Sequence, residues 1–188
     1  FVGAAGKDAY ILTNYHVVEG QNAATCDFWT NGVKQSVQGR VVWRAYDSAA
    51  PADFAVVAVD ADQLKQIDPP FVALGGADAK PSVNSFFLTS GGPKGWNVRA
   101  CKGKILDYWN GETALFQPPP VPGQSGSGVF EEINGECWLV AIVTWLIGQE
   151  GVDEAKGGAI PIANLYKALK NRPFNASERS PIPPGAVE

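Results

Sequence analysis

Residues 122–130 read Pro-Gly-Gln-Ser-Gly-Ser-Gly-Val-Phe, a serine framed by glycines and followed at once by an apolar segment. Glycine lacks a Cβ atom, so Gly123 and Gly126 allow a sharp turn and the close approach of a substrate. Such a turn exposes the Ser125 hydroxyl and aims the amides of Gly123 and Ser125 at one point, as in an oxyanion hole. Taken alone, the stretch equally fits an ordinary Gly/Ser-rich hairpin loop, so the rest of the chain has to decide.

The composition indicates a globular chain rich in β structure. Of its 188 residues, 45% are apolar and 18% are charged, which excludes a disordered protein. The 21 glycines and 14 prolines indicate frequent turns. A net charge of −4 without a basic run argues against nucleic acid as a partner. No apolar run approaches the roughly 18 residues of a membrane span. Because the chain starts at Phe1 and contains no Met, we expect a piece of a longer protein.

The cysteines do not predict a metal site or a disulfide framework. Cys26, Cys101 and Cys137 are too far apart for a zinc knuckle, and at most one pair can close. We expect them to be small buried side chains, and the sequence leaves open whether Cys101 and Cys137 pair. With a single histidine, a metal site has few ligands, and we expect neither a metal nor a cofactor.

Periodicity predicts two sets of strands. In the first half the expected strands are residues 9–13, 25–29, 33–46 and 53–59, with Asn31-Gly32 as a hairpin turn. Residues 60–81 lose periodicity and are interpreted as a connection. In the second half the expected strands are residues 85–89, 97–108, 113–116, 129–132 and 137–146, with Asn134-Gly135 as a second hairpin turn.

One helix is expected, over residues 161–169. Pro161 suits its first position, and its apolar face would consist of Ile162, Leu165, Tyr166 and Leu169. The pattern predicts an all-β fold of two β-barrels with a C-terminal helix and a site in the cleft between the barrels. The expected domains are residues 1–68, residues 69–172, and a Pro-rich tail or linker over residues 173–188.

Three side chains of complementary chemistry stand where a strand meets a turn: His16, Asp53 and Ser125. A serine hydroxyl is a poor nucleophile until a base removes its proton, and imidazole can take that proton and return it to a leaving amine. A carboxylate fixes the imidazole tautomer and stabilises the imidazolium. His16 and Asp53 fall in the first predicted barrel and Ser125 in the second, so the cleft can bring them together.

Several segments carry a family resemblance. They are Ile11-Leu12-Thr13-Asn14-Tyr15-His16-Val17-Val18, Ala52-Asp53-Phe54-Ala55-Val56-Val57, Gly123-Gln124-Ser125-Gly126-Ser127, Val140-Ala141-Ile142-Val143-Thr144-Trp145 and Gly158-Ala159-Ile160-Pro161. In this order they resemble the trypsin-like (chymotrypsin-fold) serine proteases, most of all the bacterial HtrA-like branch. The resemblance spans residues 1–171 and implies two six-stranded antiparallel barrels and an active site between them.

The resemblance also implies roles for residues. It gives catalytic roles to His16, Asp53 and Ser125 and an oxyanion hole to the amides of Gly123 and Ser125. It places the Thr144 hydroxyl near Asp53. The residues implied to bind an extended polypeptide substrate by strand addition are Pro120, Val121, Thr144, Trp145, Leu146 and Gly158.

The sequence departs from the family pattern at several positions. Gln124 stands where zymogen-activated members carry an acid that receives a new N-terminus, so activation by that ion pair is not expected. Ser127 and Gly128 replace the small residue and the proline that usually follow the nucleophile's glycine. Leu146, often glycine in the family, narrows the groove. No acid falls at the expected floor of the specificity pocket, and we expect it to accept a small or medium apolar side chain.

The sequence therefore predicts a serine endopeptidase that acts through an acyl-enzyme. An α/β-hydrolase-type esterase does not fit, because Ser127 stands where its motif needs glycine and its triad order is Ser, acid, His. Two alternatives stay open: a catalytically silent protease-like binding module, and a self-processing protease of the polyprotein or phage type. An extracytoplasmic bacterial or viral origin is favoured, and the oligomeric state is not encoded.

Overall fold

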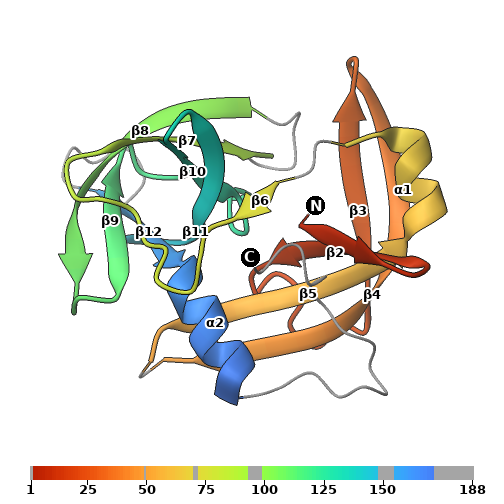
Figure 1. The fold of residues 1–188 in the computed structure, drawn as a ribbon, viewed down its shortest axis with the longest axis horizontal. Helices are drawn as coiled ribbons and strands as arrows, with labels where there is room; N and C mark the ends of the chain where they lie inside the picture. Colours follow the sequence, from red (N-terminus) through yellow and green to blue (C-terminus); the bar gives the residue numbers. More distant parts are fainter. Residues whose placement is uncertain (1, 49, 70–71, 93–98, 148–154, 172–188) are drawn as a thin grey trace.

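The computed structural model describes residues 2–48, 50–69, 72–92, 99–147 and 155–171. The predicted tail, residues 173–188, lies outside the described residues. The described chain forms two antiparallel β assemblies and two helices (Figure 1). The prediction of an all-β fold with a short C-terminal helix is confirmed.

The first assembly is a five-stranded sheet in the order β1-β2-β5-β4-β3. Its strands are β1 (Gly3–Ala5), β2 (Asp8–Thr13), β3 (Ala23–Thr30), β4 (Val33–Asp47) and β5 (Ala52–Asp60). The central strand β5 is apolar almost throughout because both of its faces are covered. Phe54 and Val56 face one apolar cluster, and Ala55 and Val57 face another. Asp53, near the start of β5, is therefore a carboxylate on the best-buried strand of this sheet.

The second assembly is a closed barrel of six strands. They are β7 (Phe86–Gly91), β8 (Arg99–Trp109), β9 (Thr113–Gln117), β10 (Gly128–Ile133), β11 (Glu136–Ile147) and β12 (Lys156–Pro161). The barrel closes because β10 pairs with both β7 and β11. A two-residue strand, β6 (Ala73–Leu74), runs parallel to β11. The core inside the barrel includes Phe87, Ile105 and Val129.

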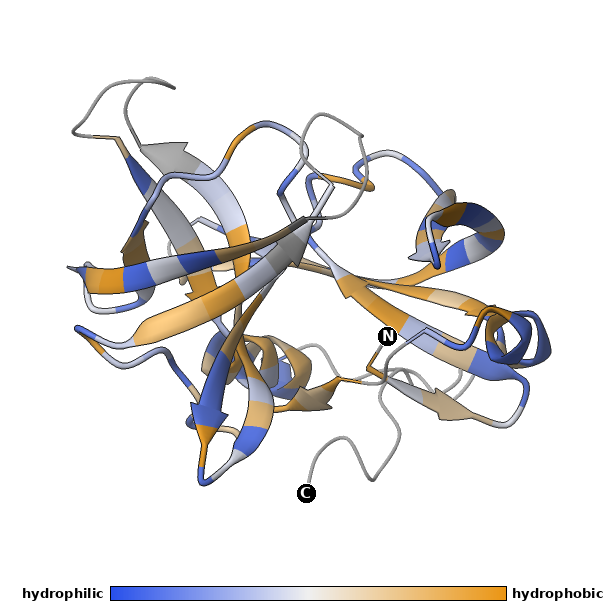
Figure 2. Ribbon diagram, turned by 90° about the horizontal axis from the view of Figure 1, so that it is seen from above, coloured by the Kyte–Doolittle hydropathy of each residue, from blue (hydrophilic) through white to orange (hydrophobic). Residues whose placement is uncertain are grey.

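Asn-Gly pairs form three of the hairpin turns. Asn31-Gly32 and Asn134-Gly135 have positive φ angles of 52° and 77°, and of 54° and 82°. This is the conformation that a two-residue hairpin turn demands and that Asn-Gly tolerates best. Both predicted turns are confirmed. Asn110-Gly111, with φ angles of 50° and 73°, makes a third turn between β8 and β9. Hydrophilic residues gather at such strand ends, and apolar residues along the middle of the strands (Figure 2).

Helix α2 (Ile162–Asn171) joins the two assemblies. Ile162 and Leu165 are fully buried in an apolar cluster that also contains Phe54 of the first sheet and Ile142 of the barrel. Figure 1 shows α2 beside β5, at the end of the barrel. The predicted apolar face is confirmed. The expected position of Pro161 is wrong by one residue, because Pro161 is the last residue of β12 and the helix begins at Ile162.

Helix α1 (Ala61–Ile67) was not expected, since the sequence reads as a connection there. Asp60 caps its first turn, and the side chains of Ala61, Leu64 and Ile67 are buried against the first sheet. The helix has only seven residues, too few for a periodic signal to stand out. Neither described helix is long and apolar enough to cross a membrane.

The expectation that the cysteines are buried is wrong for two of them. Cys101 and Cys137 are exposed, Cys26 is half-buried, and all three thiols are free. Cys137 lies in β11 beside the tip of the Asn134-Gly135 hairpin, opposite the exposed Glu132. Cys101 lies near the start of β8. Both are therefore accessible thiols rather than parts of the core.

Candidate active site

His16 and Asp53 come together because their strands are paired. Strand β2 pairs with β5 up to Thr13 opposite Ala55, and the chain then turns, with the Val18 amide donating to the carbonyl of Tyr15 at 3.0 Å. Asp53 precedes Ala55 by two residues, so it lies beside this turn. The turn holds His16. The strand register thus places a carboxylate next to the histidine.

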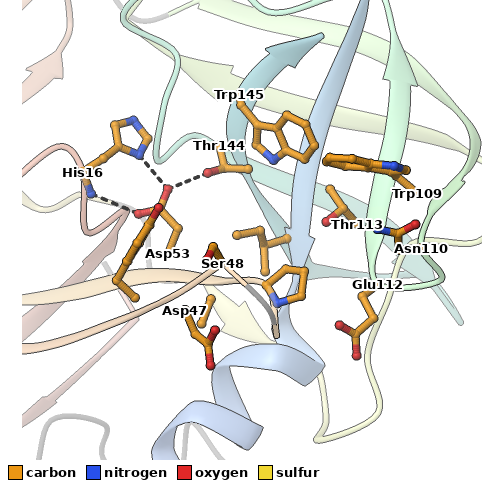
Figure 3. A pocket seen from close by; sticks show the side chains of 14 residues that line it. His16, Asp47, Ser48, Asp53, Trp109, Asn110, Glu112, Thr113, Thr144 and Trp145 are labelled. Atoms are coloured by element: carbon orange, nitrogen blue, oxygen red, sulfur yellow. Dashed lines mark hydrogen bonds and ion pairs between the residues drawn. The ribbon is translucent and has the colours of Figure 1, made fainter.

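Four hydrogen bonds orient this pair, and Figure 3 draws those that join Asp53 to His16 and to Thr144. The Asp53 Oδ2 atom lies 2.6 Å from His16 Nδ1, and Asp53 Oδ1 accepts from the His16 backbone amide at 3.0 Å. The Thr144 hydroxyl donates to Asp53 Oδ2 at 2.6 Å, and the Asn14 side-chain amide donates to the Asp53 carbonyl at 2.9 Å. The Asp53 side chain is only 10% exposed, whereas that of His16 is 40% exposed. The Nε2 atom of the imidazole is thereby left for a reacting group.

Thr144 reaches Asp53 from the other assembly. The pairing of β11 with β12 shifts register between Val143 and Trp145, which sets Thr144 out of the regular ladder. The hydrogen bond from Thr144 to Asp53 therefore joins the barrel to the first sheet. It spans 91 positions of sequence and is buried.

Ser125 lies in a turn directly before β10. Gly123 and Gly126 adopt φ angles of +92° and +81°, which glycine takes without strain. Gly126 fits closely against the end of β2, because a Cβ atom there would lie 2.6 Å from Thr13 Oγ1. The Gly126 amide also donates to the carbonyl of Val143, the neighbour of Thr144, at 2.8 Å. The serine loop thus lies beside the segments that carry His16 and Thr144.

No hydrogen bond joins Ser125 to His16 within the residues that the structure describes. Hydrogen bonds between a nucleophile and its base are often loose before a substrate binds.

The amides of the serine loop alternate in their hydrogen bonding. Those of Gln124, Gly126 and Ser127 donate to the carbonyls of Val121, Val143 and Gln124, respectively, at 3.1, 2.8 and 3.0 Å. The amides of Gly123 and Ser125, directly before and after that of Gln124, have no partner among the described residues. Two donors without partners, on either side of Gln124, are what a site for an oxyanion requires.

A pocket of about 570 Å³ adjoins the His16–Asp53 pair. The Trp109 and Trp145 rings stand on one side of it, with centroids 4.9 Å apart and planes tilted by 57° (Figure 3). Asp47 and Glu112 also line it, and Glu112 lies 3.4 Å from Lys167 Nζ. Sequence reasoning missed Trp109. The signal available was an aromatic residue directly before the Asn110-Gly111 turn.

The structure separates the predicted substrate-binding residues. Thr144 and Trp145 line the large pocket, whereas Pro120 lines a different cavity of about 40 Å³ behind the serine loop. Gly158 lies under Trp145, since a Cβ atom there would meet the indole at 2.7 Å. Val121 is half-buried in the serine loop, and the side chain of Leu146 lies outside the described residues.

Comparison with known proteins gives a family and a fold. The family model described as "Trypsin-like peptidase domain" matches residues 1–142. No curated protein sequence matches significantly. An inactive form of the Rv3671c protease from M. tuberculosis H37Rv is 19% identical with a TM-score of 0.62, and the match covers 91% of this chain and 78% of that one.

Two further solved structures are longer proteins. The serine endoprotease from Yersinia pestis is 20% identical with a TM-score of 0.63, and the match covers 90% of this chain and 55% of that chain. The HtrA-type protease AlgW, solved with a decapeptide, is 21% identical with a TM-score of 0.63, with 91% and 50% covered. This chain thus spans about half the length of these two proteins. At such identities the likeness establishes a shared fold.

Proposed function

The chain belongs to the trypsin-like peptidase domain family and is a serine endopeptidase, and we propose that Ser125, His16 and Asp53 carry out its reaction. The observation that carries this proposal is the bonding of His16 Nδ1 to Asp53 at 2.6 Å. That bond fixes the tautomer with Nε2 free to accept a proton. The amide of Ser125, unlike that of Ser127, has no partner among the described residues, and neither has the amide of Gly123.

In the proposed reaction the Ser125 Oγ atom attacks the carbonyl carbon of the scissile peptide bond while His16 Nε2 takes its proton. The carbonyl oxygen becomes an oxyanion, which the amides of Gly123 and Ser125 stabilise. Collapse of the tetrahedral intermediate breaks the C–N bond, and His16 returns the proton to the leaving amine. Water then attacks the acyl-enzyme by the same route and releases the acid and free Ser125.

The substrate in this proposal is a polypeptide bound as an added strand. Strand β10 pairs with β11 only as far as Ile142, and Val143 then bonds to the serine loop. From Thr144 on, that edge of β11 has no strand partner within the described part of the chain, so an extended peptide can pair with it. That the protease AlgW was solved with a decapeptide supports this class of substrate.

The side chain before the scissile bond is proposed to lie near Pro120, Val121 and Gly158. A small or medium apolar residue fits there best, because none of these three carries a charge. The pocket beside Trp109 and Trp145 is then left for a side chain further from the cleaved bond.

The proposal includes a two-barrel architecture with boundaries near residues 68 and 172. The five-stranded sheet would form the first barrel, and the site would lie in the cleft between barrels. Two bonds support this arrangement: Thr144 of the barrel donates to Asp53 of the first sheet, and the side-chain amide of Asn164 on α2 donates to the Pro51 carbonyl at 2.9 Å.

A fluorophosphonate probe tests the catalytic assignment, because it phosphonylates only an activated serine. We expect the probe to label the wild-type protein and Ser127→Ala, which alters a neighbouring serine of the same loop, but not Ser125→Ala. His16→Ala should lower peptide turnover by several orders of magnitude, since the triad acts as a unit. An unlabelled wild-type protein would instead favour the silent binding module, and equal labelling of Ser125→Ala would show that Ser125 is not the nucleophile.

A further inference from the structure

The residue next to the nucleophile has a buried side chain that no step of the proposed reaction uses. Gln124 is only 7% exposed, although glutamine is a residue that folding usually leaves in water. Its Oε1 atom accepts a hydrogen bond from the Val121 amide at 2.8 Å. Its own amide donates to the Val121 carbonyl at 3.1 Å. Gln124 therefore holds both backbone polar groups of Val121.

These two bonds close the turn that contains the Pro122–Gly123 peptide. Gly123 has a φ of +92°, so the peptide before it has been turned into an orientation that non-glycine residues avoid. Rotation of this peptide would change the direction of the Gly123 amide, which has no partner among the described residues. The side chain of Gln124 opposes that rotation because it fixes the chain at Val121, on the far side of the turn.

The end of β7 also packs closely against the serine loop. A Cβ atom on Gly91, at the end of β7, would lie 1.9 Å from Ser127 Oγ and 3.6 Å from the Gln124 Cα. The cavity of about 40 Å³ behind the loop is lined by Gln124, Pro119 and Thr89. The Gln124 side chain thus lies on the barrel side of the loop, and the Gly123 and Ser125 amides are left without partners among the described residues.

We propose that Gln124 is a positioning residue that holds the oxyanion hole of this protease in its active shape by bonding through its side-chain oxygen to the Val121 amide. The inference rests on the proposed catalytic role of Ser125. In this proposal the Gln124 side chain stabilises the loop, so the active conformation requires no ion pair with a chain terminus.

If Gln124 has this role, its loss should lower kcat and leave KM almost unchanged. An oxyanion hole acts on the transition state, so its distortion lowers kcat while leaving ground-state binding almost unchanged. Removal of one oxyanion donor lowers kcat by roughly 10²- to 10³-fold in well-studied proteases. Without the bond from the Val121 amide to Gln124, the Pro122–Gly123 peptide can rotate but is not forced to. We therefore expect a smaller loss of kcat, about tenfold to a hundredfold.

The experiment compares Gln124→Met with Gln124→Glu. Methionine keeps the length of the side chain and removes the acceptor, whereas glutamate keeps an oxygen that can accept from the Val121 amide in either charge state. We expect Gln124→Met to lose kcat on a fluorogenic peptide about tenfold to a hundredfold, with KM within about twofold, and to react more slowly with the fluorophosphonate. Gln124→Glu should recover most of the kcat.

The matched control is Tyr166→Phe, which removes a comparable hydrogen bond, from the Tyr166 hydroxyl to the Gly75 carbonyl at 3.1 Å, far from the loop. Its melting temperature should fall like that of Gln124→Met while its kcat stays at the wild-type value. Should Gln124→Met fail to fold, Gln124→Asn, whose amide is one methylene too short to reach Val121, takes its place.

The inference is overturned if the acceptor-free variant keeps wild-type kcat, if Tyr166→Phe loses as much, or if Gln124→Glu does not recover activity. Failure of the wild-type protein to be labelled at Ser125 is a different result, because it removes the proposed function itself.

Discussion

At the scale of single residues, the Asp53 carboxylate depends on a hydroxyl from the other assembly. Thr144 donates to the same oxygen that faces His16 Nδ1, so it helps to fix the direction in which that oxygen points. A hydrogen bond to a charged group contributes about 1.5–3 kcal/mol, which corresponds to roughly a tenfold to hundredfold change in rate if it is needed in the transition state.

We therefore expect Thr144→Val to lower kcat by about tenfold or more, while Thr144→Ser, which keeps the hydroxyl, stays near wild type. Steady-state kinetics on one peptide substrate, together with the rate of fluorophosphonate labelling, measure the effect. Equal rates for the valine and serine variants would show that the hydroxyl does not support Asp53.

Cys26 gives a prediction about pH and stability. Burial, assisted by the negative charge of Asp27, raises the pKa of its thiol from 9.0 to about 11. The folded state therefore favours the neutral thiol. This stabilisation is fully present below pH 9 and is lost as the pH rises through about 11. The free energy of unfolding lost by pH 11 is roughly 2 kcal/mol, since one unit of pKa shift corresponds to about 1.4 kcal/mol.

Urea unfolding at pH 8 and at pH 10.5 measures this effect. The free energy of unfolding should fall less for Cys26→Ala than for wild type between these two values. Tyr108, whose pKa is also raised by burial and by Glu131, titrates in both proteins, so only their difference reports Cys26. Parallel losses in both proteins would contradict the assignment.

At the scale of elements, helix α1 depends on one capping side chain. Asp60 Oδ1 accepts from the amides of Asp62 and Gln63, both at 2.9 Å, and so satisfies two of the amides that a helix start leaves without partners. Loss of such a cap costs about 0.5–2 kcal/mol.

We expect Asp60→Ala to lower the free energy of unfolding by about 1 kcal/mol and Asp60→Asn, which also caps well, to lower it much less. Chemical denaturation of the two variants measures both values. An asparagine variant as unstable as the alanine variant would mean that the charge near the helix start, rather than the cap, stabilises α1.

The elements that the sequence predicted well are those whose signal is local. Asn31-Gly32 and Asn134-Gly135 predicted two hairpins because positive φ angles are a property of the residues themselves. Helix α1 is too short to show a period, and its local signal is limited to the cap, Asp60 with Gln63 three residues later.

For the site, residue types and their order predicted the approach of His16 to Asp53. The serine loop was predicted only in outline. Sequence patterns carry no information on which side chain holds a loop, so the bond from the Val121 amide to Gln124 appeared only with coordinates. The pocket wall at Trp109 was missed for a similar reason, because it depends on the register of the β8–β9 hairpin.

At the scale of the whole molecule, the site requires the two assemblies to stay together. Asp53 lies in the first sheet and His16 in the turn after its strand β2, while Thr144 lies in the barrel and Ser125 in the loop before β10. The apolar cluster between them contains Phe54 and Trp43 from the first sheet, Ile142 and Ile160 from the barrel, and Leu165 from α2. Because they share this core, we expect the two assemblies to unfold as one unit.

Leu165 tests this coupling, since it is fully buried in that cluster and lies on α2, outside both sheets. Leu165→Ala should lower the free energy of unfolding by about 2–5 kcal/mol, because it removes buried methyl groups and leaves a cavity. Lys170→Ala, an exposed change on the same helix, should alter it by less than about 0.5 kcal/mol. Denaturant unfolding followed by far-UV circular dichroism and by tryptophan fluorescence should give coincident curves that shift together in Leu165→Ala. Two separate transitions, with only one of them shifted, would show that the assemblies fold independently and that the site is held by its hydrogen bonds alone.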